Sequence, residues 1–430
     1  MQRRILAAAI AAAMVSSAAL ADTITVVTSF PKELTEAYKK AYEKKYPNDK
    51  VEILNKGTSA GIAYVREQAA GGRPEIFWAS APDAFEVLAA EKLLQKVDMA
   101  APGIPDKIGS YPINDPEGMY RGQALAGYGF MWNTRYMQAN KLPVPKEWAD
   151  LTKPVYFGHL ATSSPSRSGT THLTFETILQ GEGWDRGWNQ ILQIAGNSAA
   201  ITERSFGVPD GVQNGQFGIG LVIDFFGLAA KASGFPTEFA YPSMTAIVPA
   251  NIAVVAGAKN AEAGKRFMHY TLSEEGQELL LDPKISRLPV LTSTYKKAPA
   301  GYPNPFSGSI QAKVNFDSEL SQSRYYVVSS LFDQIITFRH KELQAATKAI
   351  QDAEKRLVGR ASPQLEEAKK LAFSAPVSAE QAKDKELLSA FKVKKGDEAG
   401  TRRKTQIEEE WSSKAKANYI RAAELAATAK

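Results

Sequence analysis

The order of elements near the start of the chain constrains the fold most. Three short apolar runs are each followed by a polar loop and a segment with helical spacing of apolar residues; the runs are 24–27, 51–54 and 75–78, and the segments are 31–46, 62–70 and 84–90. Three such units in a row predict a parallel sheet with helices between its strands. Ligands of open parallel sheets bind beyond the carboxyl ends of the strands.

Hydroxyl side chains gather at those carboxyl ends. Ser29 follows the first predicted strand, Thr58 and Ser59 follow the second, and Ser80 follows the third. Hydroxyls and free N–H groups at a helix start suit an anion. For the loop at 57–61, a plain turn with a helix cap is an equally good interpretation.

The densest polar cluster is Ser163 to His172, which reads Ser-Ser-Pro-Ser-Arg-Ser-Gly-Thr-Thr-His. It lies between a predicted strand at 155–160 and a predicted helix at 173–179. A helix start offers unpaired N–H groups and the positive end of the helix dipole, and arginine offers a forked donor. An ordinary Ser/Thr cap beside a surface arginine is the alternative. We expect an anion to bind here, through Ser166, Arg167, Ser168, Gly169 and Thr170.

A second α/β region follows, and the last third of the chain differs in character. The second region contains a strand at 217–223 that is followed by Asp224. We interpret the stretches 122–129 and 242–249 as crossovers between two lobes, and glycines of ordinary β-bulges or turns are an equally good interpretation. From about residue 306, Lys, Glu, Gln and Ala become abundant and apolar residues fall at helical spacing. This part predicts a helical appendage with a break at 374–378, a final helix at 405–428 and a mobile loop at 394–403. A charged tail of partial order is the alternative.

The N-terminus has the pattern of a secretory signal. Arg3 and Arg4 precede an alanine-rich apolar run at 5–20, and Ala19-Leu20-Ala21 fits a cleavage site after Ala21. The run is shorter and less apolar than the ~20 residues of a membrane span. We therefore expect export. The chain has no cysteine, which excludes disulfides and thiolate metal sites.

Charge and motifs argue against several classes of protein. Without Arg3 and Arg4, 50 basic and 46 acidic residues leave a net charge of +4 spread along the chain, which does not favour nucleic-acid binding. No Gly-x-Ser-x-Gly elbow, zinc motif, calcium loop or phosphate loop is present. His172 is near two serines, but we interpret it as a first-turn helix residue facing solvent or capping neighbours. The sequence predicts a binding protein without a cofactor, not an enzyme.

Four segments carry a resemblance to a known family. They are Thr28-Ser-Phe30, Gly57-Thr-Ser-Ala-Gly61, Ser166-Arg-Ser-Gly-Thr-Thr-His172 and Leu272–Leu280, and Arg287-Leu-Pro-Val290 adds to them. Over residues 23–302 the chain resembles periplasmic solute-binding proteins of ABC importers. The similar branch is the ferric-iron-binding-like group that includes phosphoglycerate, phosphonate and hexose-phosphate binders.

The resemblance implies an α/β, two-lobed periplasmic binding protein fold of type II with an α-helical C-terminal extension. The implied parts are a signal peptide at 1–21, lobe 1 at 22–125 with part of 246–300 returning to the lobes, lobe 2 at 126–245, and the extension at 306–430. In the iron binders of this group, two adjacent tyrosines ligate Fe³⁺ after the strand that corresponds to 217–223. Here Asp224 is followed by Phe225 and Phe226, whose phenyl rings cannot coordinate a metal, so iron is disfavoured.

The function implied is a monomeric periplasmic receptor that closes two lobes around a small anionic solute and delivers it to an ABC permease. The ligand-binding residues expected are Ser29, Thr58, Ser59, Ser80, Ser166, Arg167, Ser168, Gly169, Thr170, His172, Ser205 and Asp224. Asp224 would suit a hydroxyl or amine of the ligand. The alternatives are an adaptor for a membrane sensor kinase, a ferric-iron binder and a phosphoester hydrolase.

Overall fold

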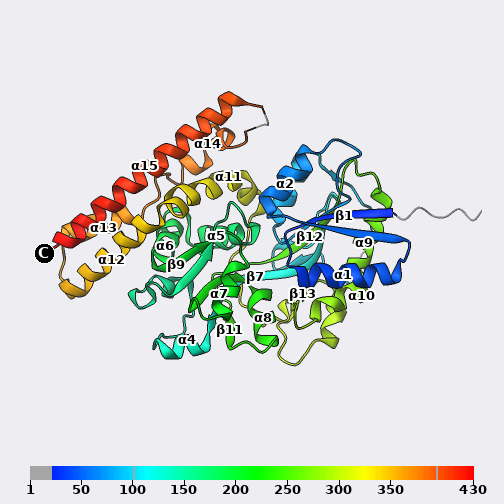
Figure 1. The fold of residues 1–430 in the computed structure, drawn as a ribbon, viewed down its shortest axis with the longest axis horizontal. Coiled ribbons are helices and arrows are strands. Elements are labelled where there is room, and N and C mark those ends of the chain that lie inside the picture. The colour runs from blue at the N-terminus through cyan, green and yellow to red at the C-terminus, as the bar shows by residue number, and fades with distance from the viewer. Residues whose placement is uncertain (1–21, 100–101, 394–395) are drawn as a thin grey trace, which may run out of the picture.

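A computed structural model describes residues 22–99, 102–393 and 396–430 (Figure 1). The predicted signal peptide and its cleavage site lie outside these residues. One mixed sheet runs through the two lobes, with the strand order β2-β1-β3-β12-β7-β10-β8-β9. Three short strands join it at the side, β4 (Leu94–Gln95) and β13 (Leu288–Pro289) in lobe 1 and β11 (Thr237–Ala240) in lobe 2.

Lobe 1 contains the three predicted strand–helix units. Its strands are β1 (Asp22–Thr28), β2 (Asp49–Asn55), β3 (Ile76–Ala79) and the antiparallel β12 (Ile247–Val255), and its helices are α1 (Lys32–Lys45), α2 (Thr58–Glu67), α3 (Pro82–Ala90), α9 (Ala261–Leu272) and α10 (Glu274–Glu278). β1 pairs in parallel with both β2 and β3, as the sequence predicts. A small hairpin, β5 (Lys107–Ile108) and β6 (Tyr111–Pro112), lies beside them.

Lobe 2 is joined to lobe 1 through β7 (Arg121–Asn133). The first half of β7 pairs with β12 and its second half with β10, so this long strand passes from one lobe to the other. The other elements of lobe 2 are β8 (Leu160–Ser163), β9 (Ser198–Thr202), β10 (Ile219–Ile223), α4 (Thr134–Ala139), α5 (Gly169–Glu182), α6 (Trp184–Asn197), α7 (Gly207–Gln213) and α8 (Asp224–Ala232).

The strand predicted at 155–160 is wrong. Pro154 to Tyr156 form one turn of 3₁₀ helix, and Gly158 has a φ of +78°, which ends any extended run. The strand β8 starts only at Leu160. The helix predicted at 173–179 begins four residues earlier, where the Ser168 side chain accepts a hydrogen bond from the Thr171 N–H and caps α5.

The last third of the chain is the predicted helical extension. It consists of α11 (Ser318–Ile335), α12 (His340–Leu357), α13 (Pro363–Ala372), α14 (Lys385–Ala390) and α15 (Glu398–Thr428). The final helix begins earlier than predicted, because Asp397 caps it and residues 398–403 are helical rather than a loop. In Figure 1 the extension lies along lobe 2, and α11 reaches between α2 and α5. No helix in the described part of the chain combines the length and apolarity needed to span a bilayer.

Candidate anion-binding site between the lobes

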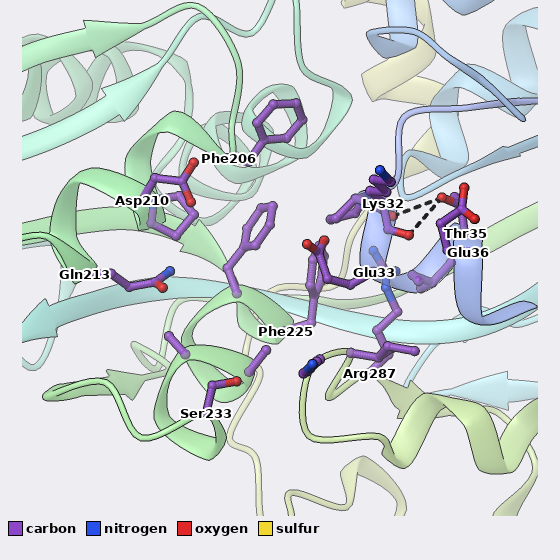
Figure 2. Close-up of a pocket in the computed structure, with 18 of the residues that line it drawn as sticks. Lys32, Glu33, Thr35, Glu36, Phe206, Asp210, Gln213, Phe225, Ser233 and Arg287 are labelled. Atoms are coloured by element: carbon purple, nitrogen blue, oxygen red, sulfur yellow. Dashed lines mark hydrogen bonds between the residues drawn. The ribbon is translucent and has the colours of Figure 1, made fainter.

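A cavity of about 840 Å³ lies between the two lobes. The start of α1 forms its wall in lobe 1, and α7 and α8 form its wall in lobe 2 (Figure 2). Phe206 and Phe225 present aromatic surface from lobe 2, and Arg287 lies on the side of lobe 1. A cavity of this size between two lobes can hold a small organic ligand.

Arg287 is a fully buried charged residue that faces the cavity. Both terminal guanidinium nitrogens donate to the Ser80 hydroxyl at 3.2 Å, while Nε has no hydrogen-bond partner. No carboxylate among the described residues forms an ion pair with it. Burial of a charge without an opposite charge is costly. An anion in the cavity would offset this cost, so Arg287 can serve as an anion-binding group.

Aromatic rings hold the guanidinium in place from both lobes. Its central carbon lies 4.0 Å from the centre of the Phe30 ring and 3.8 Å from that of Phe225. Burial lowers the pKa of Arg287 to about 9, and the negative charge of Asp224 offsets part of this decrease. The side chain therefore remains a cation at neutral pH. Cation–π stacking fixes its orientation, and Nε keeps an unused hydrogen-bond donor.

The backbone around Arg287 is also constrained. Its N–H donates to Leu280 O at 2.9 Å, and its carbonyl accepts from the Tyr302 hydroxyl at 2.7 Å. The preceding residue, Ser286, has a φ of +47°, a left-handed conformation that is uncommon outside glycine. Strained backbone of this kind is frequent beside binding sites.

The start of α1 adds a second feature that suits an anion. This helix of 14 residues begins after Pro31, no side chain caps its first turn, and residues 31–36 line the cavity. Uncapped N–H groups and the helix dipole attract negative charge. The start of α1 and the Arg287 guanidinium thus belong to the same cavity (Figure 2).

Carboxylates occupy other parts of the cavity wall. Glu33 and Glu36 come from α1, and Asp210 comes from α7 on the opposite lobe (Figure 2). Partial burial and the Glu33 charge raise the pKa of Asp210. These acceptors suit hydroxyl or amine groups of a ligand whose anionic end lies at Arg287.

None of the twelve sequence-predicted ligand residues is among those that line this cavity, but four of them are bonded to a lining residue or closely precede one in the chain. Ser80 holds Arg287, and Ser29, Ser205 and Asp224 come one or two residues before the lining residues Pro31, Phe206 and Phe225. Asp224 is buried and accepts hydrogen bonds from the Gly127 N–H and the Tyr241 hydroxyl, at 2.7 and 2.9 Å. Its carboxylate is therefore held by the protein itself.

The other predicted residues come together where the lobes touch each other. The Gly169 N–H donates to Thr58 Oγ1 at 3.3 Å, so the start of α5 contacts the start of α2 directly. Ser168 caps α5, and Thr170 O accepts from the Thr174 hydroxyl. The Ser166 hydroxyl contacts that of Ser164 at 2.8 Å. None of these residues lines the cavity.

Arg167 is exposed and forms an ion pair with Glu203, at 54% and 71% side-chain exposure. Exposed pairs of this kind contribute little free energy. The Arg167 guanidinium is therefore free to exchange Glu203 for another anion, although it lies outside the cavity lining.

His172 is fully buried, which corrects the interpretation that it faces solvent. Its Nε2 lies 3.2 Å from Asp83 Oδ2 and 3.3 Å from Ser321 Oγ, and its Nδ1 has no partner. In a Ser-His-Asp triad, the carboxylate and the serine bind different ring nitrogens. Here both are at Nε2, so the cluster does not have the geometry of a nucleophilic catalyst. Ser59 is nearby, with its hydroxyl 3.0 Å from that of Tyr325.

The described residues contain no group of three or more His, Asp or Glu side chains arranged to hold a metal ion. Phe225 and Phe226 pack against each other at 4.3 Å between ring centres and line the cavity.

Sequence reasoning missed Arg287 as a site residue. It entered only as part of the Arg-Leu-Pro-Val segment that carries the family resemblance. A local signal exists, because this arginine is a single charge between the apolar Ile285 and the apolar run 288–291. A lone cation in an apolar context is unusual unless it has a partner.

Comparison with known proteins gives three findings. Residues 73–308 match the model of the family described as bacterial extracellular solute-binding protein. The phosphoglycerate transport regulatory protein PgtC of Salmonella typhimurium is 32% identical over 345 residues, which are 79% of this chain and 82% of that protein. Among solved structures, the periplasmic binding protein AfuA of Actinobacillus pleuropneumoniae with fructose-6-phosphate bound has a TM-score of 0.66 at 18% identity, covering 74% of this chain and 99% of AfuA.

Iron-binding relatives share the fold as well. Iron-bound HitA of Pseudomonas aeruginosa has a TM-score of 0.59 at 16% identity, covering 72% of this chain and 98% of HitA. Identities this low show a common fold only, which is the expected two-lobed type II architecture. The match of the family model and the similarity to PgtC go further: the chain belongs to the family of bacterial extracellular solute-binding proteins.

Proposed function

We propose that this protein is the periplasmic substrate-binding component of an ABC importer and that it binds a small organophosphate or phosphonate between its lobes. The observation that carries the proposal is Arg287, a buried cation that faces the cavity without a carboxylate partner. The guanidinium fork matches phosphate and carboxylate oxygens. Ser80 and the start of α1 complete an anion site in lobe 1.

The remaining part of the ligand would contact lobe 2. Phe206 and Phe225 supply apolar surface, and Asp210 supplies an acceptor for a hydroxyl or an amine. Contacts from both lobes are what a closing receptor requires, because a ligand that touches both walls favours the closed state. The relatives support this class of ligand, since PgtC is named for phosphoglycerate transport and AfuA was solved with fructose-6-phosphate.

Calorimetric titration of wild type and Arg287→Met tests the proposal. The ligands are 3-phosphoglycerate, glucose-6-phosphate, fructose-6-phosphate and 2-aminoethylphosphonate. Loss of a charge-assisted bond of ~1.5–3 kcal/mol should weaken the ligand that binds roughly ten- to hundred-fold. Methionine keeps apolar contact with Phe30 and Phe225 and removes an unpaired buried charge, so the melting temperature should not fall. Unchanged affinity for every ligand bound by wild type would refute the assignment of Arg287.

Arg167→Ala serves as the matched comparison. The sequence predicts anion binding at Ser166–Thr170, whereas the cavity points to Arg287. We expect Arg167→Ala to change affinity less than Arg287→Met does, because Arg167 is exposed and pairs with Glu203. The reverse order of effects would place the anion at the start of α5.

A second candidate function is a ligand-sensing adaptor for a membrane sensor kinase. The relative PgtC is named a regulatory protein, and this chain has a large helical extension beside its lobes. Uptake of radiolabelled ligand in a deletion strain with a constitutively expressed permease separates the two functions. A substrate-binding component is required for uptake there, whereas an adaptor is not.

A further inference from the structure

Helix α11 of the extension is attached to lobe 2 by buried contacts. Arg324 donates to both carboxylate oxygens of Glu176 in α5, at 2.9 and 2.8 Å, and the two side chains are 5% and 0% exposed. Burial raises the pKa of Glu176, but the Arg324 guanidinium outweighs burial and holds the pKa below its usual value. Phe332 also stacks on Phe175, with 4.8 Å between ring centres.

The same helix contacts lobe 1. The Ser321 hydroxyl donates to Asp83 Oδ2 in α3 at 2.8 Å, and the Tyr325 hydroxyl is 3.0 Å from that of Ser59 in α2. One turn of α11 therefore touches both lobes, since Ser321 is also 3.3 Å from His172 Nε2 in α5. We call this contact between α2, α3, α5 and α11 the seam.

Beneath α11 the two lobes meet without space between them. A Cβ atom on Gly57 would lie 2.7 Å from the Arg167 carbonyl oxygen, and one on Gly169 would lie 2.6 Å from Ala81 Cβ. Both distances are too short for a side chain, so glycine is required at each position for this approach. The polar cluster predicted to bind an anion is, in this structure, part of the seam.

The contacts that join the two lobes differ between the seam and the cavity. At the seam, Asp83, His172, Ser321 and Tyr325 are all buried, so separating the lobes there would break a buried polar network. At the cavity, the lobes are in contact through the Arg287 guanidinium, which stacks on the Phe225 ring at 3.8 Å, and through an exposed hydrogen bond of 3.5 Å from Arg204 to Asn55. Neither contact is a hydrogen bond between buried side chains. Glu33 and Asp210 place like charges on opposite walls of the cavity, and the pKa of Asp210 is raised by burial and by the Glu33 charge.

We infer that α11 keeps the seam closed and that the lobes pivot about it, so that solute enters and leaves only on the cavity side, between α1 and α7/α8. The extension is then part of the machinery that opens and closes the lobes. This inference rests on the proposed function in one respect, namely that the lobes open to admit a solute.

The absence of cysteine allows a direct test by electron spin resonance, because only introduced cysteines carry the spin label. Glu67→Cys on α2 with Asp185→Cys on α6 reports on the seam, and Lys40→Cys on α1 with Ala232→Cys on α8 reports on the cavity side. All four positions are exposed and lie outside the proposed anion site. Distances are measured in the full chain without ligand and again with 3-phosphoglycerate.

We expect the ligand-free protein to give a cavity-side distribution that is longer and broader than in the structure, and a narrow seam distribution at the distance of the structure. Ser321→Ala with Tyr325→Phe should broaden the seam distribution. Equal broadening of both pairs in wild type would overturn the inference, and so would two narrow distributions. These distances do not depend on a ligand, so failure of 3-phosphoglycerate to bind would count against the choice of solute and leave the test of the seam standing.

Discussion

Arg287 and Asp224 place opposite charges near the cavity, and burial shifts the pKa of each toward its neutral form. The pKa of Asp224 rises to about 6 and that of Arg287 falls to about 9. No direct ion pair between them is found in the described structure, since Asp224 accepts from Gly127 and Tyr241 while Arg287 donates to Ser80. The positive charge of Arg287 therefore stays available to a ligand.

The raised pKa of Asp224 predicts a pH dependence of stability. An unfolded aspartate has a pKa of ~3.9, so between about pH 4 and pH 6 the folded state binds the extra proton and the free energy of unfolding falls as the pH rises. The shift corresponds to about 3 kcal/mol over this window. Asp224→Asn should flatten the profile, measured by urea unfolding from pH 4 to pH 7.5. An equally steep decrease in Asp224→Asn would show that other groups cause it.

At the level of single residues, the sequence could predict hydroxyls at the strand ends but not their partners. Ser80 was identified, yet its partner Arg287 lies about 200 residues later and no local pattern joins them. His172 was expected at a helix start, which is correct, but it is buried because Tyr325 and Ser321 of α11 cover it. Such contacts depend on tertiary packing and leave no trace in the spacing of residues.

At the level of elements, helices and strands were predicted correctly where the spacing of apolar residues is regular, and incorrectly where it is not. The first three strand–helix units are confirmed, since each combines an apolar run with an amphipathic helix. The apolar residues at 155–160 instead form a turn, because Pro154 lacks an N–H and Gly158 adopts a positive φ. The start of α5 was placed too late, since the cap at Ser168 precedes the first apolar residue.

The ion pair between α5 and α11 predicts a large cost for removing one partner. Arg324→Met leaves the Glu176 carboxylate buried without a cation, which should lower the free energy of unfolding by ~3–5 kcal/mol. The double variant Glu176→Gln/Arg324→Met should recover part of this loss. Arg421→Met, which breaks the exposed pair with Glu424, should cost less than ~1 kcal/mol. Urea unfolding compares the variants, and similar costs for Arg324→Met and Arg421→Met would argue against tight docking of α11.

At the level of the whole molecule, α11 and α12 pack the extension onto the lobes, and α15 lies on the outer side of these helices (Figure 1). Beyond α11, His340 Nε2 is 3.0 Å from Ala195 O, and Gln344 donates to Ser198 O at 2.7 Å, so α12 is bound to α6. Composition and helical spacing predicted a folded extension. They could not predict where it docks, because the surfaces it covers belong to residues more than 100 positions earlier.

A chain that ends at residue 317 tests how far the lobes depend on the extension. Removal of α11 to α15 would expose Phe175 and leave Glu176 without Arg324. We expect aggregation or a much lower melting temperature, measured by differential scanning calorimetry. A truncated chain with the melting temperature and ligand affinity of the full protein would show that the extension is dispensable for folding and binding.

The most direct test of the central claim is a crystal structure of the full chain with the tightest-binding phosphorylated ligand from calorimetry. Our account predicts the phosphate or phosphonate oxygens within hydrogen-bond distance of the Arg287 guanidinium, with the rest of the ligand between α1 and α7/α8. A ligand whose anionic group binds at Ser166–Thr170, with Arg287 still bound only to Ser80, would contradict it.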